Sequence, residues 1–154
     1  MKPITKIKLC LWIIIIGLVL SGLTAFPLET ELGIISSHIS AASPFYHWFN
    51  SIYTAIKQTN EQFPYLSYGT DWLAFAHLVI AIVFIGPLRD PVKNIWVIEF
   101  GMIACILIFP LAFIAGSIRG IPFYWRLIDC SFGIIGFIPL YICKINIKKL
   151  QSSG

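Results

Sequence analysis

Charged residues are scarce in this sequence. Only 12% of the 154 residues are Asp, Glu, Lys or Arg, whereas 58% are hydrophobic. A soluble domain of this length cannot bury so much apolar surface, but a lipid bilayer can solvate it. The formal charge of +4 is carried by residues at the ends of apolar runs, so it does not indicate nucleic-acid binding. The composition predicts an integral membrane protein with no room for a separate soluble module.

Motifs for catalysis and metal binding are also missing. The sequence has no phosphate-cradling glycine loop, no HExxH pair, no nucleophile elbow and no visible inverted repeat. It has no CxxC motif, which argues against a thiol oxidoreductase and favours small apolar fillers between helices. The cysteines in question are Cys10, Cys105, Cys130 and Cys143. Of the three histidines only His77 lies in an apolar run, so we predict neither a metal nor another cofactor.

Four apolar runs are long enough to cross a bilayer as helices. The predicted spans are residues 9–26, 71–88, 95–118 and 122–143. Pro110 should kink the third span, Gly86-Pro87 should end the second, and Gly120 should cap the end of the third. We therefore predict an all-α, antiparallel four-helix bundle as one domain over residues 1–150, with 151–154 as a tail.

The first run resembles the start of a signal peptide because three lysines precede it. However, Leu23 occupies the position three residues before cleavage after Ala25, where a small residue is needed. We expect this run to be retained as the first transmembrane helix.

Residues 27–70 form the most polar part of the chain. Within them, apolar side chains recur at helical spacing between residues 44 and 62, with polar side chains on the opposite face. Ser43 and Pro44 suit the cap and first position of a helix. The pattern predicts an amphipathic helix on the outer side that either lies on the membrane surface or caps the bundle.

The distribution of basic residues predicts the orientation of the chain. Of the eleven Lys and Arg residues, only Lys57, Arg119 and Arg126 fall on the side of the long loop. Because cytoplasmic loops are enriched in Lys and Arg, both termini should be cytoplasmic and the long loop should face outward. The Ile- and Lys-rich composition favours a bacterial inner membrane.

Ionisable residues gather at the predicted outer level. Residues 117–131, SIRGIPFYWRLIDCS, place two arginines and an aspartate around the turn between the third and fourth spans. The second span begins at the same level. The predicted cluster contains Asp71, His77, Arg119, Arg126 and Asp129.

Three interpretations of this cluster remain open. It is either an ion-pair network that fixes the turn, or a site for a phosphate or carboxylate such as an anionic lipid headgroup. A catalytic version would use His77 as a general base oriented by Asp129. Near the other membrane face, Glu99 is either a carboxylate paired with a nearby lysine or a component of an ion relay.

These observations leave three classes of function. The favoured one is a non-enzymatic accessory protein that binds lipid or an anion, or that assembles with another membrane protein or with copies of itself. A small oligomeric transporter or channel is the first alternative. An intramembrane enzyme acting on a lipid-linked substrate is the second.

Overall fold

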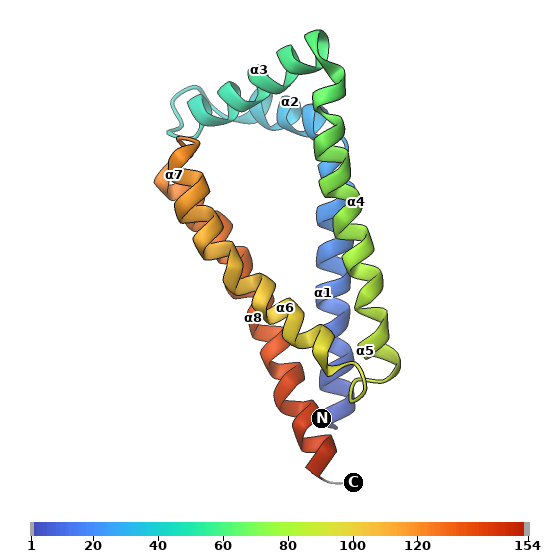
Figure 1. The fold of residues 1–154 in the computed structure, drawn as a ribbon. Coiled ribbons are helices and arrows are strands. Elements are labelled where there is room, and N and C mark those ends of the chain that lie inside the picture. The colour runs from blue at the N-terminus through green and yellow to red at the C-terminus, as the bar shows by residue number, and fades with distance from the viewer. Residues whose placement is uncertain (1, 153–154) are drawn as a thin grey trace. The chain divides into compact units, whose positions relative to one another are not determined.

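The computed structural model describes residues 2–152, and all regular structure within that range is helical. Four helical runs are long and apolar enough to cross a membrane. They are Pro3–Ala25, Pro64–Arg89, Ile95–Ile118 and Phe123–Ser152. The predicted all-α membrane fold class is thus confirmed (Figure 1), and the chain is a small polytopic membrane protein.

The chain forms two compact units rather than one evenly connected domain. One unit contains the chain up to Ile16 together with the chain from Ala81 onward, and the other is Gly17–Ile80. The helices α1 (Pro3–Ala25) and α4 (Tyr68–Val83) each contribute residues to both. The single domain over residues 1–150 stays a prediction.

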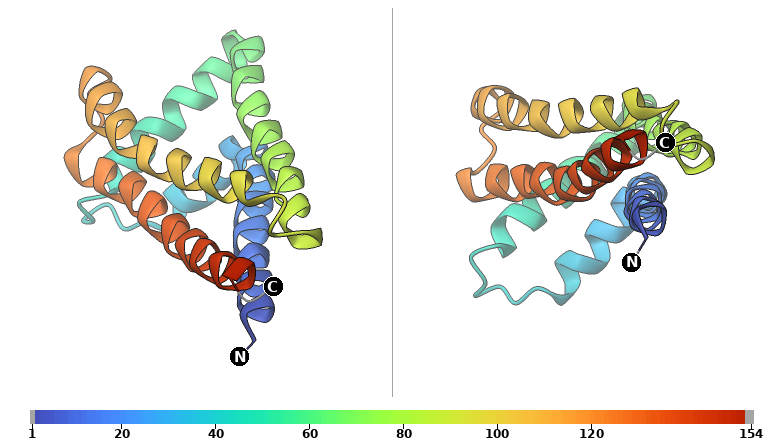
Figure 2. Two further views of the ribbon diagram at one scale, coloured as in Figure 1. Left: turned by 60° about the horizontal axis from the view of Figure 1, so that its bottom comes forward. Right: turned by 90° about the horizontal axis from the view of Figure 1, so that it is seen from below.

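The first unit is organised by α6 (Ile95–Pro110) and α8 (Phe123–Ser152), which run side by side in opposite directions (Figures 1 and 2). Small residues allow their close approach. A Cβ atom added to Gly133 would lie 2.7 Å from the carbonyl oxygen of Cys105. One added to Gly101 would lie 2.9 Å from the side chains of Leu140 and Phe84. Gly101 of α6 and Gly133 of α8 therefore allow the two helices to pack closely, as small residues do between membrane helices.

The N-terminal part of α1 completes the core of this unit. Ile7 and Leu11 are fully buried, and the thiol of Cys143 in α8 donates a hydrogen bond to the Ile7 carbonyl (3.6 Å). The short helix α5 (Ile85–Arg89) precedes α6. The second apolar run ends at Arg89, one residue past its predicted end, and its Gly86-Pro87 pair lies in the first turn of α5. Proline is tolerated there because the first N–H groups of a helix have no partner within that helix.

Pro110 interrupts the third apolar run, as the sequence predicts. It ends α6, and a π-helical turn η2 (Leu111–Ala115) and the short α7 (Gly116–Ile118) follow. Proline has no N–H to donate, and its ring crowds the carbonyl of the residue four positions earlier. In the π-helical turn after Pro110 the Gly116 N–H donates to the Leu111 carbonyl, and such turns are frequent at functional sites.

The second unit contains the long loop, which is largely helical. It forms α2 (Leu28–His38), α3 (Tyr46–Gln62) and η1 (Pro64–Leu66), and it leads into α4. The side chain of Asn60 donates to Glu29 (2.5 Å) and accepts from the Ser67 hydroxyl, so α2, α3 and the start of α4 are linked.

The predicted amphipathic helix is confirmed as α3, although it begins two residues late. Its apolar side chains, such as Phe49 and Ile52, are half-buried, whereas its polar Lys57 is exposed. Ser43 does not cap the helix as predicted. Its hydroxyl accepts from the Phe45 N–H (3.3 Å) in a turn that precedes α3, because serine can satisfy local backbone donors in a turn as well as at a helix cap.

The third membrane run, Ile95–Ile118, has its predicted bounds, and the other three runs are longer than predicted. Within the described residues α1 begins at Pro3 rather than residue 9, and α8 ends at Ser152 rather than Cys143. Gln151 and Ser152 of the predicted tail are therefore helical, and residues 153–154 lie outside the described residues. Lysines lie in both of these helix extensions. Their long side chains can reach the membrane surface from a helical backbone, so the charges are compatible with a continued helix.

Candidate functional site

The turn between α7 and α8 has a well-defined backbone. Gly120 adopts a left-handed φ of 69°. The N–H of Ile121 donates to the Gly116 carbonyl (2.9 Å), and that of Gly120 donates to Ser117 (3.2 Å). This pair of bonds is a Schellman motif, and it confirms that Gly120 ends the third span.

Arg126 of α8 holds this turn in place. Its Nε donates to the Ile121 carbonyl (2.7 Å), and its Nη1 donates to the Ser117 hydroxyl (2.6 Å). The Ser117 hydroxyl in turn donates to the Phe113 carbonyl (2.6 Å). Gly116 leaves space for the arginine stem, since an added Cβ would lie 3.1 Å from its Cδ. Arg126 therefore fixes the turn by hydrogen bonds to neutral groups.

Arg119 and Asp129 have a different environment. Both line a pocket of about 270 Å³ between the α6–η2–α7 run and α8. Its other lining residues are apolar or glycine: Ile108, Leu111, Ala112, Ala115, Gly116 and Ile121. Across residues 2–152, neither charged side chain has an ion-pair or side-chain hydrogen-bond partner. The ion-pair network considered from the sequence is not formed here.

The pocket lies at the end of a membrane span. Arg119 follows the last residue of α7 and is exposed, whereas Asp129 is half-buried in α8. Asp129 is six residues beyond Phe123, the first residue of α8, which corresponds to roughly 9 Å along the helix axis. Tyr124 and Trp125 lie between them in the sequence, and such aromatics favour the membrane interface. Arg119 therefore lies at the outer end of the pocket, whereas Asp129 lies further along the span among the apolar lining residues.

Asp71 and His77 belong to the other unit. Asp71 lies in the first turn of α4, where a carboxylate interacts favourably with the helix dipole. The Nδ1 atom of His77 hydrogen-bonds the Leu73 carbonyl (2.7 Å). Because a carbonyl only accepts, Nδ1 carries the proton. The structure thus brings together Arg119, Arg126 and Asp129, and the proximity of Asp71 and His77 to them stays a prediction.

Glu99 is paired. Its Oε1 atom lies 2.9 Å from Nζ of Lys144, which joins α6 to α8. This is the lysine partner that the sequence suggested. A salt bridge between adjacent helices accounts for the carboxylate without an ion relay.

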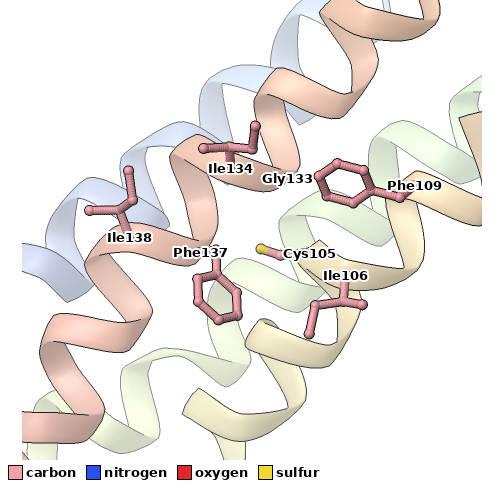
Figure 3. Close-up of a pocket in the computed structure, with 7 residues that line it drawn as sticks. All are labelled: Cys105, Ile106, Phe109, Gly133, Ile134, Phe137 and Ile138. Atoms are coloured by element: carbon pink, nitrogen blue, oxygen red, sulfur yellow. The ribbon is translucent and has the colours of Figure 1, made fainter.

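A second pocket of about 270 Å³ lies deeper along the same two helices (Figure 3). Its lining is Cys105, Ile106 and Phe109 from α6, and Gly133, Ile134, Phe137 and Ile138 from α8. Figure 3 shows only apolar side chains and one thiol around it. It offers a hydrocarbon chain a surface but provides no charged group for recognition.

The sequence did not indicate that two of the cysteines meet. The side chains of Cys10 and Cys143, from α1 and α8, interact with each other and are buried. Cys10 and Cys143 are far apart in the sequence, so their contact depends on the packing of α1 on α8 and could not be predicted from local pattern. Their burial fits the predicted role as small core residues. Across the described residues, no three His, Cys, Asp or Glu side chains gather to form a metal site.

The chain matches no protein-family model, no curated protein and no solved structure. Its function must therefore be inferred from the chemistry of its own side chains.

Proposed function

We propose that this protein binds the phosphate-bearing headgroup of a membrane lipid in the Arg119–Asp129 pocket, and that it is not an enzyme. The observation that carries the proposal is a pocket with apolar walls and two charged side chains that have no partner among the described residues. A membrane phospholipid has a hydrocarbon body and a charged headgroup, so it can match both the apolar walls and the charged side chains.

The energetics of the pocket favour a charged ligand. An ionisable side chain at the centre of a membrane helix costs roughly 2.5–3.5 kcal/mol on insertion scales, and less nearer the interface. Arg126 reduces its cost by hydrogen bonds to the turn, and Glu99 does so through Lys144. Among the described residues, Asp129 within α8 has no such compensation and Arg119 at the end of the span has no side-chain partner, so a bound headgroup would pair both.

Arginine suits a phosphate in particular. Its planar guanidinium can donate two parallel hydrogen bonds to phosphate oxygens, and it is always charged at physiological pH. In the proposed orientation, with both termini cytoplasmic, the pocket would face the outer leaflet of a bacterial inner membrane. The apolar lining next to Arg119 would then contact the glycerol and upper acyl region of the lipid.

The alternative functions have less support. A catalytic His77–Asp129 pair requires contact between two units, and Nδ1 of the histidine is already bonded to its own helix. A relay through Glu99 would first have to break a salt bridge.

The proposal is tested by native mass spectrometry of protein extracted in a mild detergent. The wild type and Arg89→Gln should retain a phospholipid, whereas Arg119→Gln should lose it. Arg89 is the matched control because it is an exposed arginine of the same unit at a different turn. A phospholipid retained equally by Arg119→Gln contradicts the proposal. A polypeptide partner in place of lipid also contradicts it and indicates complex formation.

A further inference from the structure

We infer that the pocket selects a zwitterionic phospholipid whose headgroup carries a primary ammonium, of the phosphatidylethanolamine class. This inference rests on the proposed function. It arises from the observation that one pocket presents one cation, Arg119, and one anion, Asp129.

A purely anionic headgroup matches only half of this site. Its phosphate would be attracted to Arg119, but the same negative charge would face the Asp129 carboxylate. Like charges repel, and the repulsion is stronger where apolar walls reduce the local dielectric. Because apolar side chains line the pocket around both residues, the Asp129 carboxylate should weaken the binding of lipids with a net negative charge.

An ethanolamine headgroup matches both halves. It carries a phosphate and an ammonium group separated by a short linker, so both charges can be paired within one small pocket. A primary ammonium has three N–H donors, as a lysine side chain does, and an aspartate accepts several hydrogen bonds. A choline headgroup carries the same charge but has no N–H, so it forfeits these bonds.

The two residues lie at different levels of the pocket. Arg119 lies in the turn and is exposed, whereas Asp129 lies in α8 and is less exposed. Neither is held by another side chain among residues 2–152, so both are available to a ligand. Two N–H groups of Arg126 are already bonded to Ser117 and Ile121, so these two groups do not compete with Arg119 for the phosphate.

The test is lipid titration in native mass spectrometry with delipidated full-length protein. The probes are phosphatidylethanolamine, phosphatidylcholine and phosphatidylglycerol with identical acyl chains. The wild type should bind phosphatidylethanolamine about tenfold more tightly than the others, the scale of one charge-assisted hydrogen bond. Asp129→Asn should abolish this preference while retaining binding, and Asp129→Glu should preserve it.

Controls separate the inference from the proposed function. Glu61→Gln removes a carboxylate from the other unit and should leave the preference unchanged. If all three lipids bind equally but Arg119→Gln weakens them all, the proposed function stands and the ethanolamine preference is refuted. A preference that persists in Asp129→Asn also refutes it. If Arg119→Gln has no effect on any lipid, the proposed function itself fails. Circular dichroism and size-exclusion chromatography identify any variant that misfolds, and Asp129→Glu then supplies the comparison.

Discussion

Replacement of Gly133 by alanine should separate the two helices that form the pocket. The added Cβ would lie 2.7 Å from the carbonyl oxygen of Cys105, 3.4 Å from a ring carbon of Phe109 and 3.6 Å from Cβ of Ile108. The closest of these is a backbone atom, so it cannot rotate away as the end of a side chain can. Relief of the contact requires α6 and α8 to move apart.

The cost of this movement can be estimated from packing. Extra methylenes in a well-packed core typically cost about 1–3 kcal/mol, and the backbone contact places Gly133→Ala toward the upper part of that range. Gly136→Ala should cost less, because its added Cβ meets the Cys105 Sγ atom at 3.0 Å and that side chain can shift.

The free energy of unfolding can be measured by titrating the protein from mild detergent into SDS, with circular dichroism as the readout. Gly17→Ala is the matched control because no atom lies within 4 Å of its added Cβ. Alanine is favoured over glycine in a helix by up to about 1 kcal/mol, so this control should be neutral or stabilising. If Gly133→Ala is as stable as Gly17→Ala, the close packing of α6 against α8 is wrong.

Two further predictions concern other parts of the first unit. Arg126→Gln removes the hydrogen bonds to Ile121 and Ser117 and should lower the free energy of unfolding by roughly 1–3 kcal/mol, again by SDS titration. A change no larger than that of Arg119→Gln, expected within about 0.5 kcal/mol, would contradict the structural role of Arg126. Between α5 and α6, the backbone N–H of Lys93 donates to Asp90 and, with the lysine charge, lowers the pKa of that carboxyl below its ordinary value of 3.8. The ionised carboxylate therefore stabilises the folded state above pH 3.8, and this contribution is lost as the pH falls through the folded pKa. Carboxyl-carbon NMR should measure that pKa, and a value at or above 3.8 would show that the Lys93 contacts are absent.

The sequence predicted the membrane helices well because hydropathy depends only on local composition. It placed their ends less accurately, since it detects the apolar part of a helix rather than the whole helix. Lys6 and Lys8 lie outside the predicted first span but inside α1. Ile147, beyond the predicted end of the fourth span, is fully buried. Polar ends continue as helix because backbone hydrogen bonding, not hydrophobicity, determines where a helix stops.

The site was only partly predictable. Composition identified residues 117–131 because charges are rare in an apolar chain. It could not distinguish Arg119 from Arg126, since both lie in the same short stretch around the turn and have the same chemistry. The distinction depends on the Schellman motif at Gly120, which exposes the Ile121 carbonyl to Arg126. The pocket depends in turn on how α6 and α8 pack, which local pattern does not encode.

Headgroup binding at this pocket can be tested directly by measuring the distance between the lipid phosphate and Arg119. Solid-state NMR with phosphorus–carbon dipolar recoupling can report this contact in protein that carries labelled arginine in phosphatidylethanolamine bilayers. The chain has only three arginines, so Arg119→Gln identifies the signal of interest by its absence. We predict strong phosphorus dephasing of the Arg119 guanidinium carbon and weaker dephasing of Arg126 and Arg89. Dephasing of Arg119 no greater than that of Arg89 would contradict headgroup binding at this pocket.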